Sequence, residues 1–146
     1  MRAALVLEPL TAVAYNDIAW PYLIGPPEQC VPGLAALLTQ KAVLLEPANW
    51  DCRNSLGVAY YRLGLWREAL DTLTLSLNLP GERSDAFDLF FLAMAYQRLG
   101  QVDCARKCYE QANQWQAQAH LSPENAYQLN SFRSEAASRL GLPPPQ

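Results

Sequence analysis

Two stretches of this chain nearly repeat one another at a separation of 36 residues. Residues 54–64 read NSLGVAYYRLG and residues 90–100 read FFLAMAYQRLG, with six of the eleven positions identical. In both copies apolar residues recur at i, i+3, i+4 and i+7, the spacing of one buried helix face. A glycine closes each copy, as it does at many helix C-termini. The repeat indicates stacked helical units, because one unit alone cannot bury its apolar edge.

A second amphipathic helix follows each copy. Residues 66–79 form the first of these, and the dipeptide Pro80-Gly81 ends it. Its apolar side consists of Trp66, Ala69, Leu70, Leu73 and Leu77. The second such helix spans residues 101–115, with Ala105, Tyr109 and Ala112 on the equivalent side. Since strand patterns are nearly absent, the sequence predicts an all-α fold built from tandem helical hairpins.

The same frame fits the chain before the first good copy, although less closely. Asn16 stands where Asn54 stands in the later unit, and Ala19 stands where Gly57 does. Residues 14–25 then form the first helix of an earlier hairpin and residues 32–49 the second, joined by a longer, proline-rich loop. We therefore predict a degenerate hairpin over residues 11–47.

One more helix is predicted after the last hairpin, over residues 122–141. Ser122 is a suitable N-cap, Pro123 suits the first turn, and Gly141 suits the stop. Polar residues such as Asn125 and Gln128 give this helix one wet face. These features are typical of a capping helix at the end of a stack.

Composition limits the function classes. The chain has 146 residues, one domain's worth, with 51% hydrophobic and 17% charged residues. A net charge of −3 argues against a broad nucleic-acid surface, and no apolar run is long enough to cross a membrane. The four cysteines lack the spacing of a disulfide framework, which favours a reducing, cytoplasmic setting.

The repeated residues resemble the tetratricopeptide repeat (TPR) family. They are Leu56, Gly57, Tyr60 and Ala69 in one unit and Leu92, Ala93, Tyr96 and Ala105 in the next, with Pro47 closing the preceding unit. The resemblance implies a short right-handed α-solenoid of antiparallel hairpins, in which the small residues Gly57 and Ala93 permit close helix approach. Its parts are a degenerate repeat (11–47), two repeats (50–81 and 85–118) and a capping helix (122–141). The departures from the family pattern are the 36-residue spacing, due to the LPGERS insertion, and Ser76 where alanine is usual.

More specifically, the chain looks like TPR modules at the C-terminal end of large bacterial multidomain proteins, where they follow a Ser/Thr kinase or β-propeller domain. In that setting residues 2–16 fit the tail of one more repeat, and the chain is either a module cut out of a longer protein or a stand-alone relative. Kinase motifs are absent from the sequence. The resemblance therefore implies a scaffold that binds a peptide or a partner domain.

In TPR proteins the first helix of each hairpin lines a concave binding surface. The residues at these places, which we predict to contact a partner, are Asn54, Val58, Tyr61, Arg62, Phe87, Phe90, Met94, Gln97 and Arg98. Asp51, Asn16 and Trp20 occupy further inward places, whereas Phe91 is assigned to the core. Arg62 and Arg98 recur on adjacent helices whose axes should lie roughly 8–10 Å apart, a suitable separation for binding an acidic group.

Two other interpretations of these residues stay open. The arginines near two helix C-termini can simply favour the helix dipole and keep the surface wet. The module can also have a structural role, docking onto its own chain or onto a second copy. Four tryptophans in so small a chain fit this role, because tryptophan is enriched at interfaces.

The sequence contains few residues suited to catalysis or to metal binding. Cys104 and Cys108 lie four apart, and His120 is the single histidine, whereas a structural zinc site needs four ligands. Cys52 and Cys108 are better explained as small core residues. A single histidine leaves few candidate residues for general acid–base catalysis. We expect no metal, no cofactor and no enzymatic activity.

Overall fold

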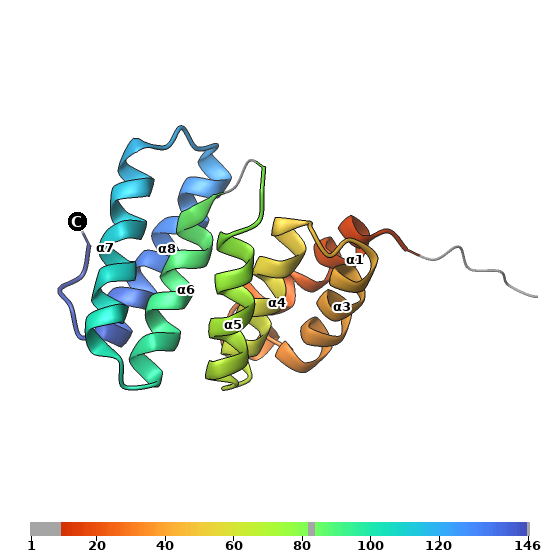
Figure 1. Ribbon diagram of the computed structural model, residues 1–146, viewed down its shortest axis with the longest axis horizontal. Coiled ribbons are helices and arrows are strands. Elements are labelled where there is room, and N and C mark those ends of the chain that lie inside the picture. The colour runs from red at the N-terminus through yellow and green to blue at the C-terminus, as the bar shows by residue number, and fades with distance from the viewer. Residues whose placement is uncertain (1–9, 82–83, 146) are drawn as a thin grey trace, which may run out of the picture.

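A computed structural model describes residues 10–81 and 84–145 of the chain. All regular structure in these ranges is helical (Figure 1). The elements, in order, are α1 (Ala12–Ala19), α2 (Pro21–Ile24), the 3₁₀ helix η1 (Pro27–Gln29), α3 (Pro32–Leu45), α4 (Trp50–Arg62), α5 (Trp66–Leu77), α6 (Asp85–Arg98), α7 (Val102–Gln118) and α8 (Pro123–Leu140). The prediction of an all-α fold is confirmed for the described residues.

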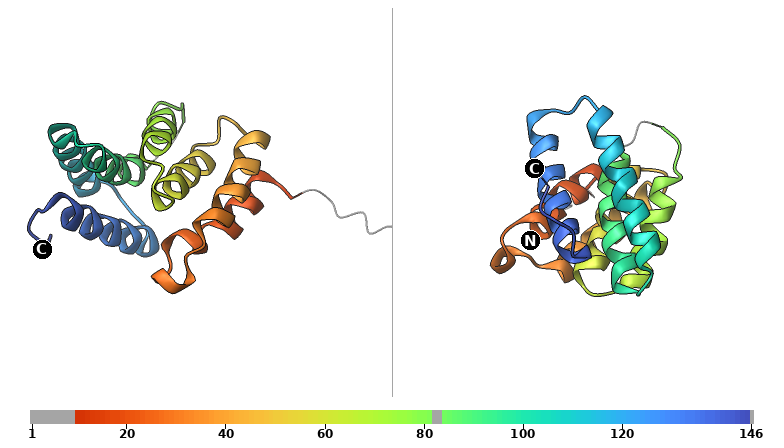
Figure 2. Two further views of the ribbon diagram at one scale, coloured as in Figure 1. Left: turned by 90° about the horizontal axis from the view of Figure 1, so that it is seen from below. Right: turned by 90° about the vertical axis from the view of Figure 1, so that its left-hand side faces the viewer.

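The helices form hairpins that stack side by side. The pairs α4–α5 and α6–α7 pack closely, and α1 packs against α3 although α2 and η1 lie between them in sequence. Adjacent hairpins contact through α3 with α4 and α5 with α6. The last helix, α8, packs on α6 and α7 and lies on the side of the molecule where α2 and α4 lie (Figure 2, left).

The repeated glycines end their helices in the same way. Gly64 has φ of 79° and Gly100 has φ of 80°, in the left-handed region that glycine adopts without strain. In each case the next residue donates its backbone N–H back to a tyrosine carbonyl at 2.9 Å, Leu65 to Tyr60 and Gln101 to Tyr96. This hydrogen bond satisfies one of the last free carbonyls of each helix. The predicted stops are therefore confirmed.

Gly57 marks the place where α4 and α5 cross. A Cβ atom added to Gly57 would lie 2.5 Å from Cγ and Cδ2 of Leu73, much closer than a carbon–carbon contact allows. Leu73 is fully buried, so it has little room to move. The prediction that a small residue at position 57 permits close helix approach is confirmed.

The first hairpin differs from the sequence prediction. Residues 14–25 do not form one helix, since α1 ends at Ala19 and the short helix α2 begins at Pro21. Proline lacks an N–H group and cannot continue the hydrogen-bond ladder of α1. The break leaves Trp20 at the bend between the two helices. The predicted tail of a further repeat, residues 2–16, lies largely outside the described residues. Within the described part, Thr11 caps α1, because its Oγ1 accepts a hydrogen bond from Ala14 N at 3.1 Å.

The last helix agrees closely with its prediction. Ser122 Oγ accepts a hydrogen bond from Asn125 N at 3.2 Å, and Gly141 at the other end has φ of 70°. Its buried face holds Leu129, Phe132, Ala136 and Ala137. No helix among the described residues combines the length and the apolar character that a membrane span requires.

Candidate functional site: a groove between α1, α4 and α8

The helix α8 crosses the inner side of the stack and reaches the first hairpin. The Phe132 ring lies 6.1 Å from the Trp20 ring, 5.9 Å from Phe87 and 4.9 Å from Phe91, all in edge-to-face orientations. Only 3% of Phe132 is exposed. Residues of α6, of α8 and of the α1–α2 bend thus share one aromatic cluster. The capping helix therefore fills part of the surface that the sequence assigns to a partner.

Arg62 binds a carboxylate of its own chain. Its Nη2 donates to Glu135 Oε1 of α8 at 2.8 Å, and its Nη1 donates to Glu135 Oε2. Its Nε donates to the carbonyl of Leu23 at 3.2 Å. Burial alone would lower the pKa of Arg62, but the bonds to Glu135 outweigh that effect and raise the pKa above its usual value. The guanidinium thus bridges α2 and α8 through three of its N–H groups.

The predicted pair of arginines therefore does not form one anion site. The guanidinium carbon of Arg62 lies 5.3 Å from the Phe91 ring centroid, beside α8. The guanidinium of the exposed Arg98 lies 5.1 Å from the Trp66 ring instead. The two positions are equivalent in sequence, but α8 supplies Glu135 to one of them only.

Most of the other predicted contact residues are packed inside the chain. Val58, Phe90 and Met94 are fully buried, and Tyr61 is 4% exposed. The Phe90 ring packs on Tyr109 of α7 at 5.9 Å, rather than facing the inner side. Gln97 is half-buried. The assignment of Phe91 to the core is confirmed, and Phe87 and Phe90 are buried as well because α7 and α8 cover α6.

A buried carboxylate joins the two central hairpins. Asp88 of α6 has no exposed surface and accepts three hydrogen bonds: from Asn54 Nδ2 at 2.8 Å, Trp50 Nε1 at 2.8 Å and Ser76 Oγ at 3.0 Å. Burial raises the pKa of Asp88 to about 6, although the three donors act in the opposite direction. Ser76, where the repeat pattern has alanine, is thereby explained as a donor to this carboxylate.

The same network fixes two side chains at the edge of an open groove. Asn54 and Trp50 are held by Asp88, and the Trp50 ring packs edge-to-face on Phe87 at 6.3 Å. The groove runs between α1, the start of α4, the start of α6 and the start of α8, with a volume of about 450 Å³. Its lining residues are Asn16, Asp17, Trp20, Pro21, Trp50, Asp51, Asn54, Ser84, Phe87, Glu124, Asn125 and Gln128.

Five residues at the predicted inward places line this groove: Asn16, Trp20, Asp51, Asn54 and Phe87. They come from three different hairpins, so the TPR frame did bring together residues that are far apart in sequence. The α8 residues were missed because a capping helix carries no local signal of where its N-terminal turn will lie. Trp50 was noted only as part of a tryptophan excess, and nothing in the sequence singled out Asp17.

The charged residues of the groove are all acidic. Asp17, Asp51 and Glu124 are exposed there, and no lysine or arginine is among the described lining residues. The pKa of Asp51 is raised, first by partial loss of hydration in the groove and second by the negative charge of Asp17. The two carboxylates are thus close enough to repel each other.

The cysteines show no sign of metal chemistry in the part of the chain that the structure describes. All four are free thiols. Burial raises the pKa of Cys52 and of Cys108 to about 11, so both are protonated at neutral pH, whereas metal binding requires the thiolate. Cys104 is exposed, and no group of three or more histidine, cysteine or acidic side chains in the described ranges is placed to hold a metal ion.

Comparison with solved structures supports the fold. The chain is similar to the first TPR domain of Spaghetti (RPAP3), solved with a bound HSP90 peptide, SRMEEVD. The TM-score is 0.64 at 17% identity, and the match covers 94% of this chain and 99% of that domain. No family model and no curated protein matches the sequence. The prediction of a TPR-like helical solenoid is confirmed at the level of the fold.

Proposed function

We propose that this chain is a non-catalytic protein-interaction module that holds a segment of a partner protein in the groove between α1, α4 and α8. The observation that carries the proposal is an open groove with aromatic walls and polar walls on the inner side of a TPR-like stack. Its walls are preorganised, because Asp88 holds Trp50 and Asn54 in place. A cytoplasmic setting and an origin as part of a larger bacterial protein stay predictions from the sequence.

The ligand of the similar RPAP3 domain is not transferred to this chain. Three of the last four residues of the peptide SRMEEVD are acidic, and the described charged residues of this groove are acidic as well. An acidic segment would face like charge here, which is unfavourable. Arg62 is also unavailable, because it is bound to Glu135. We therefore propose a partner segment for this groove but withdraw the expectation that its acidic groups are held by Arg62 and Arg98.

Peptide selection followed by site-specific cross-linking tests the proposal. Peptides selected from a random display library on the wild-type protein are mixed with variants that carry a photo-reactive phenylalanine analogue at one site. Gln128 of α8 lines the groove, whereas Leu75 of α5 is 56% exposed and lies outside it. We expect cross-links from position 128 and none from position 75. Cross-links from both positions, or a selection that yields no binding peptide, would contradict the proposal.

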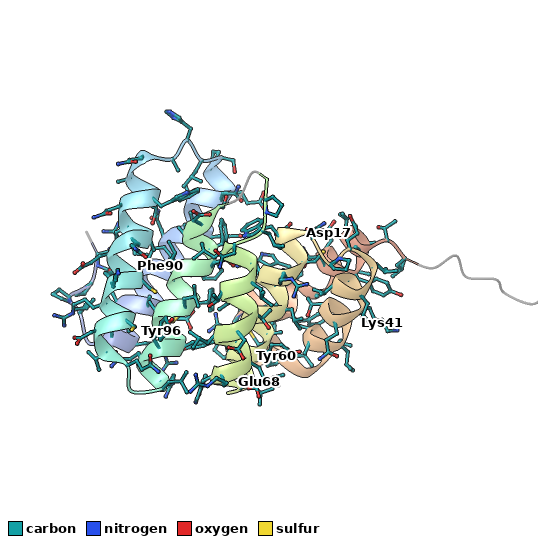
Figure 3. The ribbon with its side chains drawn as sticks, in the orientation of Figure 1. Asp17, Lys41, Tyr60, Glu68, Phe90 and Tyr96 are labelled. Carbon is teal, nitrogen blue, oxygen red and sulfur yellow. The ribbon has the colours of Figure 1, made fainter. Side chains whose placement is uncertain are left out.

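A second function, docking onto its own chain or onto another copy, is favoured by an apolar stripe on the edge helix α3. Leu34, Leu37 and Leu44 are 41%, 61% and 81% exposed, at spacings that place them along one side of the helix. Lys41, labelled on this edge in Figure 3, interrupts the stripe. If this role applies, the sedimentation coefficient rises with concentration and the double variant Leu37→Glu/Leu44→Glu stays monomeric. A monomer at all concentrations would exclude self-association.

A further inference from the structure

We propose that the groove between α1, α4 and α8 receives a lysine or arginine side chain of the partner segment. This inference rests on the proposed function and adds the chemistry that the partner must supply. Three features of the groove support it: its charge, an unsatisfied buried acceptor, and its aromatic residues.

The charge of the groove favours a cation. Asp17 comes from α1, Asp51 from the first turn of α4, and Glu124 from the first turn of α8, so three separate elements each bring a carboxylate to one cavity. None of the three forms an ion pair with another described residue. The repulsion between Asp17 and Asp51 noted above would be relieved by a positive charge between them. A cationic side chain therefore complements this part of the surface.

Asn16 supplies the second part of the argument. The residue is only 5% exposed, and Oδ1, which is itself buried, accepts no hydrogen bond from any described group of the chain. Leaving a buried acceptor unsatisfied costs about 1–3 kcal/mol, and among the unsatisfied buried side-chain atoms of the described residues Asn16 Oδ1 is the one that belongs to a residue of this groove. Asn16 lines the groove next to Asp17 in sequence. Because Oδ1 is itself buried, an ammonium or guanidinium N–H group can donate to it only after the Asn16 side chain turns toward the groove.

The aromatic rings match the rest of a basic side chain. Trp50 is held through its Nε1–H bond to Asp88, and Trp20 is held by the edge-to-face contact with Phe132. Both residues line the groove. A lysine or arginine has a long apolar stem, which packs well on aromatic surfaces, and its cationic head is attracted to the face of an indole ring. The groove thus has aromatic residues for the apolar stem and carboxylates for the charged head group.

The test uses four acetylated, amidated pentapeptides of glycine that differ only at the central residue. That residue is lysine, arginine, norleucine or glutamate, and binding is followed by the indole N–H signals of the protein in two-dimensional NMR. Trp20 and Trp50 report on the groove, whereas Trp66 and Trp115 lie outside it and serve as internal controls. We expect the lysine and arginine peptides to shift the Trp20 and Trp50 signals and to bind roughly tenfold more tightly than the norleucine peptide.

Matched variants separate this effect from net charge. Asp17→Asn/Asp51→Asn should weaken lysine-peptide binding by about tenfold, because two of the three carboxylates are gone. Glu68→Gln/Asp71→Asn removes the same charge from α5, where both residues are exposed. In Figure 3 Asp17 is labelled near the upper edge of the molecule and Glu68 near the lower edge. Binding by this control should stay within about twofold of wild type.

The chain's own Arg83 is checked separately, because residues 82 and 83 lie outside the described ranges and precede Ser84 of the groove. If the variant Arg83→Ala binds the lysine peptide much more tightly than wild type, the groove takes the chain's own arginine and the proposal of a partner residue is overturned. Equal binding supports a partner residue.

Two further outcomes would overturn the inference. They are equal binding of all four peptides, and equal loss of binding in the two double variants. If selected peptides without basic residues cross-link from position 128, the proposed function stands and the charge preference alone fails. If no peptide cross-links there, the proposed function fails as well.

Discussion

The buried Asp88 makes a prediction about the pH dependence of stability that can be worked from the structure. Its pKa is about 6 in the folded chain, against an ordinary value of 3.8. Since the folded state binds the proton more tightly than the unfolded state, protonation of Asp88 stabilises the fold. This stabilisation is fully present below pH 3.8 and is lost as the pH rises through about 6.

The size of the effect follows from the difference of the two pKa values. A difference of about 2.2 units corresponds to about 3 kcal/mol at about 1.4 kcal/mol per unit. Some of that change falls below pH 4, so we expect about 2–2.5 kcal/mol between about pH 7 and about pH 4. Other carboxylates change the stability over the same range, and they must be subtracted.

The variant Asp88→Asn provides that subtraction, because it keeps the side-chain shape and removes the titration. It should be less stable than wild type at every pH, since an amide turns an N–H donor toward at least one of the three groups that now donate to Asp88. Urea unfolding followed by circular dichroism measures both proteins across the range. The stability difference between them should widen by about 2 kcal/mol on acidification. A constant difference would refute the assignment of Asp88 as a buried carboxylate with a raised pKa.

Two other predictions concern the packing of the hairpins and the ion pair between Arg62 of α4 and Glu135 of α8. Gly57→Ala should destabilise the fold by about 1–2 kcal/mol in urea unfolding, because overpacking against Leu73 outweighs the gain in helix propensity. Gly33→Ala, where no atom lies within 4 Å of the added carbon, should be neutral or slightly stabilising. Equal changes of stability in the two variants would contradict the close packing of Gly57 against Leu73. Glu135→Gln should lower the free energy of unfolding by about 1–2 kcal/mol, since it weakens the bidentate pairing of the largely buried Arg62. The double variant Arg62→Met/Glu135→Leu should recover most of that loss, because it removes both charges together. If the losses of stability of the single variants at positions 62 and 135 simply add up in the double variant, as measured by thermal unfolding, the two side chains do not interact.

Local patterns in the sequence predicted the hairpins well. The helical periods, the glycine stops and the close approach at Gly57 each depend on residues that lie within one or two turns of one another, or in the same hairpin. Such information is contained in spacing and residue type. The degenerate first hairpin was predicted too, although the effect of Pro21 on α1 was not. A proline in a helical pattern is a local signal that the prediction should have used.

The inner surface was predicted less well, because it depends on contacts between distant parts of the chain. Arg62 and Glu135 are 73 residues apart in sequence, and neither residue shows a pattern that names the other. Asp88 and its donor Asn54 are 34 apart and belong to different hairpins. Once α8 covers α6, residues at inward places of α6 become core. The part of the surface that stays open is decided by where the capping helix begins.

The account depends on the position of α8, which lies on the inner side of the stack and leaves a groove open beside α1 and α4. The most direct measurement is the nuclear Overhauser effect between the ring protons of Phe132 and the indole protons of Trp20, whose ring centroids lie 6.1 Å apart. The structure predicts cross-peaks between these two rings and their loss in Phe132→Leu. If the cross-peaks are absent in the wild-type protein, α8 does not cover the inner surface. Arg62 would then be free of Glu135, and the wider basic surface inferred from the sequence would be the better candidate for partner binding.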